Sequence, residues 1–416
     1  MLRQSRLIFT FVLLVNLMLG AATQSSATER RKPQFQTESS YLLLPLYVEL
    51  PGIGKMVVVT GSAGNIAGTN VDAYVLGVTG DVQGLAAEIS DIHIIPQTLI
   101  LSVFNAEMNK VTQNSYGSRG MDSDPDNYTL VEASQFDYFE PTITLTLFDR
   151  RFEVFGAKGK HTVNITRIYD PEGNLINDFS PGYLTESSTT TYGALLDLTD
   201  DRQDPRVGGR GAVTRRHTPT ENPDSPDYQV LDTSLTAYLP VGKLSTIALN
   251  YFQSEAQVAR EGQTDRALLE QQLGIECLGD PQCEAARAAL VENYWAANKY
   301  GTATSIGGIN RLRAYPEGRF QGAHVRYLGA EFRWNLMEGF QPFDWFIWKD
   351  IRTGSQIAFF YETATVADTK EKLGDINKSA MGIGFRLVTA SGYVYRAEAA
   401  TGSEGATQIV TFQYPW

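Results

Sequence analysis

The chain has 416 residues, of which 43% are hydrophobic, and a formal net charge of −12; it contains 37 glycines, 20 tyrosines and 20 phenylalanines. No uninterrupted apolar run of about 18 residues follows the N-terminal region, which excludes a helical membrane protein. The acidic balance argues against nucleic acid as a partner, because the chain has no basic stripe to neutralise phosphates. The composition alone fits either a soluble α/β protein or one large membrane barrel.

The first residues have the features of a secretory signal peptide. Arg3 and Arg6 precede a mostly apolar segment of 13 residues, and small residues then make cleavage plausible after residue 22 or residue 27. A single membrane anchor is the alternative, but 13 residues are short for a helix that crosses a bilayer. We assign residues 1–27 to a cleaved signal and residues 28–40 to a short periplasmic segment.

Residues 41–416 are predicted to form one all-β domain, a transmembrane antiparallel β-barrel of about 16 strands. A strand that crosses a membrane has about ten residues, which alternate between a lipid face and a lumen face. Polar stretches at 109–132 and 218–227 are predicted to be exposed loops. Eleven strand candidates precede the long loop described below: 55–61, 70–78, 85–95, 98–104, 136–148, 151–155, 161–169, 190–198, 209–215, 229–238 and 244–252.

Residues 255–300 break this alternation. Leucines and alanines at 267–273 and again at 285–294 have helical spacing, which predicts two short helices inside a long loop. Cys277 and Cys283 lie between these helices, and an oxidising periplasm favours a disulfide between them. Two cysteines with no histidine nearby make a poor zinc site, so no metal is predicted.

Five segments in the last third of the chain keep a period of two: 325–336, 357–363, 381–387, 393–399 and the C-terminal end. In the first of them, Leu328 and Trp334 lie on one face, and Glu331 and Arg333 lie on the other. A soluble β-sandwich shows the same alternation, but it would not usually place tyrosine and tryptophan near strand ends, as an aromatic girdle does. The pattern therefore favours a barrel.

The chain ends on an aromatic residue, which is also unusual for a sandwich. Val410, Phe412, Tyr414 and Trp416 lie on one face, with Thr411 and Gln413 on the other, and we interpret the first four as the lipid-facing side of the last strand.

A glycine-rich motif lies at the end of the long loop. Its residues are Gly307, Gly308, Leu312, Arg313, Ala314, Tyr315, Gly318, Arg319 and Phe320. The motif resembles the sixth-loop signature of the outer-membrane insertase and surface-antigen superfamily, which contains BamA, TamA and the two-partner-secretion transporters. Ala314 stands where the family has a glycine.

Three further segments resemble the same family: the turn at 200–208, the strand at 360–364 and the hairpin at 396–405. Glu362 and Ala364 replace the aspartate and glycine of the family strand. Family barrels have sixteen strands, with five after the sixth loop, which matches the five segments counted above. The resemblance is specific for residues 190–416. It also implies that Val410, Phe412, Tyr414 and Trp416 are a C-terminal assembly signal, which the barrel assembly machinery would recognise during biogenesis.

The resemblance implies that the loop, assigned to 255–324, folds into the barrel and that Arg313 pairs there with acidic side chains. The alternation places Glu331 and Glu362 on the lumen face, so these are the expected partners, and a guanidinium can bind carboxylates through two hydrogen bonds. The alternative is that all three are ordinary solvated lumen charges. Such a pairing would be structural or gating, and no catalytic residue is predicted.

Family translocators also carry periplasmic POTRA domains, for which residues 28–40 leave no room, so a barrel-only member is expected. The expected function is to assist assembly, insertion or translocation of protein or lipid at the outer membrane of a Gram-negative bacterium. The alternative is a passive channel or surface antigen that keeps only the scaffold. Expected partners are outer-membrane lipids, the barrel assembly machinery and an unidentified periplasmic partner or client.

An enzyme is the least favoured interpretation. The four histidines are scattered without metal-ligand spacing, and residues 303–307 fall one residue short of a Gly-x-Ser-x-Gly elbow. An outer-membrane lipase is therefore disfavoured, and no cofactor is predicted.

Overall fold

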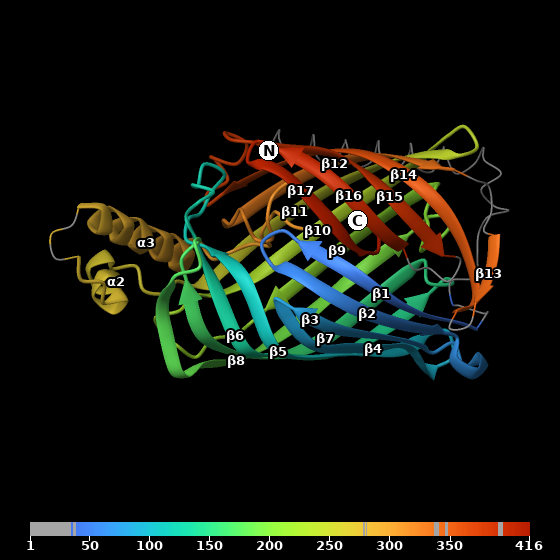
Figure 1. The fold of residues 1–416 in the computed structure, drawn as a ribbon, viewed down its shortest axis with the longest axis horizontal. Helices are drawn as coiled ribbons and strands as arrows, with labels where there is room; N and C mark the ends of the chain where they lie inside the picture. Colours follow the sequence, from blue (N-terminus) through green and yellow to red (C-terminus); the bar gives the residue numbers. More distant parts are fainter. Residues whose placement is uncertain are drawn as a thin grey trace.

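The computed structural model describes residues 35, 39–277, 279, 281–336, 341–345, 348–389 and 394–416. The expected signal peptide and nearly all of the segment 28–40 lie outside these residues. The described chain is an antiparallel sheet of long strands that curves into a barrel, and two helices project from one end of it (Figure 1).

Seventeen strands join into one antiparallel sheet. The strands are β1 (Ser40–Leu50), β2 (Gly54–Gly64), β3 (Asp72–Gly80), β4 (Val82–Ile95), β5 (Leu99–Tyr116), β6 (Tyr128–Leu147), β7 (Phe152–Tyr169), β8 (Leu175–Asp197), β9 (Gly208–His217), β10 (Asp227–Val241), β11 (Ser245–Arg260), β12 (His324–Asn335), β13 (Gln341–Trp345), β14 (Trp348–Ala367), β15 (Lys378–Thr389), β16 (Val394–Gly402) and β17 (Gly405–Phe412). In this sheet β1 to β12 pair in chain order, β12 then pairs with β14, and β14 to β17 again pair in chain order.

Sixteen of these strands form the barrel wall. β13 is a short strand that pairs only with the first residues of β14, whereas β12 pairs with β14 over the whole length of β12. β1 and β17 lie side by side where the wall closes, because Phe412 of β17 packs against Val48, Met56 and Val58 of the first two strands. The result is an almost closed ring of sixteen strands.

The wall is apolar outside and charged inside. On β12, Leu328 and Trp334 point outward and are 51% and 45% exposed, whereas Glu331 and Arg333 point inward and are buried. On β15, Met381, Ile383, Phe385 and Leu387 are all exposed, and Arg386 between them is fully buried. A soluble sandwich would bury the apolar face, so this inverted arrangement is that of a transmembrane barrel.

The strand count agrees with the sequence-based count, but two errors in that count cancel. β1 was not among the eleven early candidates, and the candidates 151–155 and 161–169 are two parts of the single strand β7. The loop predicted at 109–132 is only 117–127, since β5 and β6 extend into it. The long loop is 261–323 rather than 255–324, because β11 continues to Arg260.

The two helices lie in the connection between β11 and β12. α2 (Arg266–Leu273) begins after Asp265, whose carboxylate accepts hydrogen bonds from the amides of Ala267 and Leu268, as an N-cap does. α3 (Pro281–Tyr300) packs against α2 and leads back toward the barrel (Figure 1). Neither of these described helices is both long enough and apolar enough to cross a membrane.

Candidate functional site

After α3 the chain turns into the barrel. The amide of Ala303 donates to Gly322, and Ile306 pairs with Phe320 as an isolated bridge, so residues 303–322 form a narrow loop inside the wall. A buried apolar cluster surrounds this loop and includes residues from β11, β12, β14, β15 and β16; its members in the loop are Ala303, Ile306, Leu312, Ala314, Tyr315 and Phe320. We call residues 303–322 the inner loop.

The glycines of the motif allow the inner loop to turn tightly. Gly307 and Gly308 have φ of 113° and 101°, and a Cβ on either would overlap the Pro316 carbonyl or the Glu317 carboxylate. Among the motif residues between them and Gly318, Leu312 takes the left-handed conformation, with φ of 57°, and Ala314 does not. The alanine in place of the family glycine is therefore compatible with the backbone.

Arg313 is the centre of the site. Its Nε lies 2.8 Å from Glu362 Oε1, and its Nη2 lies 3.2 Å from Glu331 Oε2, so the structure brings the expected partners together. Nη1 makes two further hydrogen bonds of 2.9 Å to Glu398, which was not among the expected partners. The amide of Arg313 also donates to Glu362 Oε2 at 2.7 Å, and the guanidinium stacks on Phe360.

Three more arginines complete the cluster. Glu331 accepts from Arg333 and Arg386 at 2.6 Å, and Glu398 accepts from Arg386 and Arg396 at 2.7 Å. We call these seven residues the lumen charge cluster: Arg313, Glu331, Arg333, Glu362, Arg386, Arg396 and Glu398. Their side chains in these ion pairs are at most 1% exposed, which contradicts the alternative of solvated lumen charges.

The other aromatic and charged residues of the motif hold the inner loop to its surroundings. The Tyr315 phenol donates to the carbonyl of Ser379 at 3.1 Å, and Tyr315 meets Phe320 edge to face. Arg319 pairs with Glu404 of the β16–β17 turn at 2.8 Å and donates to Ser123 of the β5–β6 loop. The motif is thus held in the lumen by Arg313 and at the loop end of the barrel by Arg319.

A second arginine joins the loops at this end of the barrel. Arg119 of the β5–β6 loop donates to Asp368 of the β14–β15 loop, to the carbonyl of Gly301 and to the hydroxyl of Thr302. Asn293 of α3 accepts from the Arg119 amide and donates to Gly117. We call this set the loop clasp, because it joins three connections that are far apart in the sequence.

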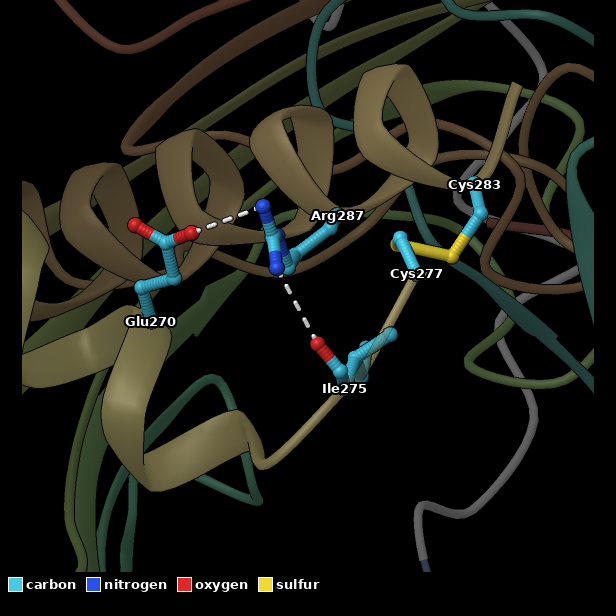
Figure 2. The surroundings of a disulfide bond; sticks show 5 residues. All are labelled: Glu270, Ile275, Cys277, Cys283 and Arg287. Atoms are coloured by element: carbon cyan, nitrogen blue, oxygen red, sulfur yellow. Dashed lines mark hydrogen bonds and ion pairs between the residues drawn. A yellow bond between two sulfur atoms is a disulfide. The ribbon is translucent and has the colours of Figure 1, made fainter. Parts of the chain in front are cut away.

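The disulfide lies outside the barrel, at the α2–α3 turn. Cys277 and Cys283 are bonded to each other, and Arg287 of α3 pairs with Glu270 of α2 at 3.0 Å and donates to Ile275 (Figure 2). In the same hairpin, hydrogen bonds from Arg266 hold the pKa of the Glu292 carboxyl below its usual value. The hairpin is therefore cross-linked independently of the lumen charge cluster.

The end of the chain differs from its expected orientation. Val410 and Phe412 follow the alternation, but Gln413 takes a left-handed conformation with φ of 63°, and β17 stops there. Tyr414 and Trp416 then lie inside the barrel, where they touch Asp204 and Tyr327, so they are not lipid-facing as predicted. The left-handed conformation of this one residue turns the side chains that follow it from the lipid face to the lumen. The assembly-signal role of these four residues stays a prediction.

The sequence contained a signal for Glu398. It alternates with Ala397 and Ala399 on the same face as Arg396, which would have placed it in the lumen with Glu331 and Glu362. Among the described residues, no group of His, Cys, Asp and Glu is arranged to hold a metal ion. The cluster offers charge and hydrogen bonds, and its carboxylates are all engaged by guanidinium groups.

Comparison with solved structures identifies the fold. BamA from Haemophilus ducreyi lacking POTRA domains 1–3 superimposes with a TM-score of 0.50 at 11% identity, over 90% of this chain and 70% of that one. The chain has the fold of the BamA barrel. CdiB from Escherichia coli follows with a TM-score of 0.49, 12% identity and coverage of 91% and 67%. No protein-family model and no curated protein matches the sequence.

Proposed function

We propose that this barrel lies in the bacterial outer membrane and assists the insertion or translocation of protein or lipid there. The observation that carries the proposal is the inner loop, which Arg313 fixes inside the lumen through three buried carboxylates. A sixth-loop motif held in this way, on a barrel of the BamA fold, supports a regulated rather than a passive barrel. Fold alone does not assign a function, so the motif and its geometry are the stronger support.

The proposed function does not involve catalysis by the lumen charge cluster. In the described lumen each carboxylate of the cluster is bound by at least one arginine, so none is positioned as a free general base. The role of the cluster would be to hold or release the inner loop. A passive channel or surface antigen is the second candidate.

A depletion experiment tests the proposal. Cells that lose the protein should lose one or a few outer-membrane or surface components, detected by comparing the composition of outer-membrane fractions before and after depletion. Re-expression of the natural chain should restore them, and re-expression of an Arg313→Glu variant should not. An unchanged outer membrane together with reduced uptake of small solutes would instead support the passive channel.

A further inference from the structure

The last four residues form a tail that lies against the lumen charge cluster. The Tyr414 phenol donates to Asp204 at 2.7 Å and accepts from Gln356 at 3.3 Å. Three residues of the tail (residues 413–416), Gln413, Tyr414 and Trp416, also line a polar cavity of about 320 Å³ at the end of the barrel where β17 stops. The tail is therefore seated by specific contacts and is not a frayed chain end.

One chain of hydrogen bonds leads from the tail to the inner loop. The indole of Trp416 donates to the Tyr327 phenol at 2.9 Å, and this phenol donates to Glu362 Oε1 at 2.8 Å. Glu362 in turn accepts from both the amide and the guanidinium of Arg313. Three successive side-chain contacts thus connect the C-terminal residue to the centre of the site.

A second connection runs through Arg333. Its guanidinium carbon lies 4.1 Å from the centre of the Tyr414 ring, and its Nε donates to Glu331, which also binds Arg313. Nη1 and Nη2 of Arg333 are buried and make no hydrogen bond to the described residues. The ring of Tyr414 therefore adds a stabilising contact to a buried cation that also pairs with Glu331 and lies over the rings of Tyr238 and Trp416.

The tail continues directly from β17, the strand that lies beside β1 at the closure of the wall. The amide of Gln413 donates to Val394 at 2.7 Å, so the inward turn starts at the last contact between β17 and β16. A movement of β17 away from β1 would therefore pull directly on the tail and strain both connections to Arg313.

We propose that the tail is an internal latch that couples the position of the end of β17 to the retention of the inner loop by Arg313. Because such coupling is reciprocal, release of Arg313 loosens the tail, and withdrawal of the tail loosens Arg313. The coupling is carried by two explicit contact routes rather than by proximity alone. It goes beyond the proposed function, since it holds for any cargo or for none.

Hydrogen exchange on the purified full-length protein tests the latch. Trp416→Phe keeps the ring and removes the donor to Tyr327, so the amides of residues 312–315 should exchange about five-fold faster, as the loss of one buried hydrogen bond allows. Trp334→Phe, on the lipid face of β12, is the matched control and should leave these amides unchanged. In the reverse direction, Arg313→Lys should speed exchange in residues 410–414.

A second variant keeps the test decisive. Tyr414→Phe retains the ring against Arg333 but loses the contacts to Asp204 and Gln356, and it should speed exchange both in the tail and in residues 312–315. Unchanged exchange at 312–315 in both Trp416→Phe and Tyr414→Phe would overturn the latch. Deletion of the tail is a poor test, because it also removes two residues of the candidate assembly signal.

Discussion

At the scale of single residues, the carboxylates of the lumen charge cluster are not equivalent. Four arginines face three glutamates, and moving each ion out of water costs several kcal/mol before pairing offsets it. Glu331 is shared by Arg313, Arg333 and Arg386, whereas the guanidinium that pairs with Glu362 in the described lumen is that of Arg313. Removing one charge should therefore have consequences that depend on which pair is broken.

Arg313→Glu should destabilise the barrel by about 3–5 kcal/mol, because it sets a buried carboxylate among three others. The second change Glu362→Arg should restore part of the loss, as coupled partners do in a double-mutant cycle. Glu331→Arg should not, since it would place a new guanidinium beside Arg333 and Arg386. The measurement is the urea midpoint of unfolding in detergent, and equal rescue by both second changes would contradict the assignment of partners.

At the scale of elements, alternation located most strands because a membrane strand has a period of two. It failed for β1, whose sequence Leu42-Leu43-Leu44-Pro45-Leu46 is apolar on both faces and contains a proline. It also failed where β5 and β6 extend past the roughly ten residues that a membrane requires, since their polar outer residues look like a loop.

The candidate site was predicted in part for a related reason. The motif and the alternation together placed Arg313, Glu331 and Glu362 in one lumen, because side-chain direction follows position along a strand. The alternation could not indicate the inward turn at Gln413. A single left-handed residue there directs the following side chains into the lumen, and the residue types in the sequence do not reveal it. The loop clasp was also missed, because Arg119 and Asp368 lie in loops with no period.

The disulfide should affect the helical hairpin and not the barrel. Its two sulfurs close a short ring of the chain, so its loss should cost the hairpin about 2 kcal/mol, and the pairing of β11 with β12 should be unchanged. Free-thiol labelling of unreduced, denatured protein should detect no cysteine. After reduction, limited proteolysis should cut first within 261–300 while the gel mobility of the folded barrel is retained; quantitative labelling before reduction would contradict the bond.

At the scale of the whole molecule, the apolar exterior and the charged interior favour a lipid bilayer over water as the environment of the barrel. Exposed aliphatic and aromatic side chains cover the outer face on both halves of the barrel, among them Val57, Ile143, Val213, Leu249, Phe359 and Ile383. The protein should therefore be recovered with outer membranes, and it should migrate faster on a detergent gel before boiling than after. Recovery in the soluble periplasm would contradict the barrel as a membrane protein.

The contents of the lumen predict how the barrel conducts ions. The loop clasp joins three loops at one end of the barrel, the inner loop lies in the lumen, and the tail turns into the lumen where β17 stops, so we expect the lumen to be obstructed. In planar bilayers the natural chain should give small, flickering currents. Arg119→Ala combined with Arg313→Glu should raise the open-state conductance at least several-fold, because the first change opens the clasp and the second releases the inner loop.

Lys299→Ala, at the end of α3, serves as the control and should conduct like the natural chain. A wide and steady open state of the natural chain would instead indicate a passive pore, and the inner loop would then not be a plug.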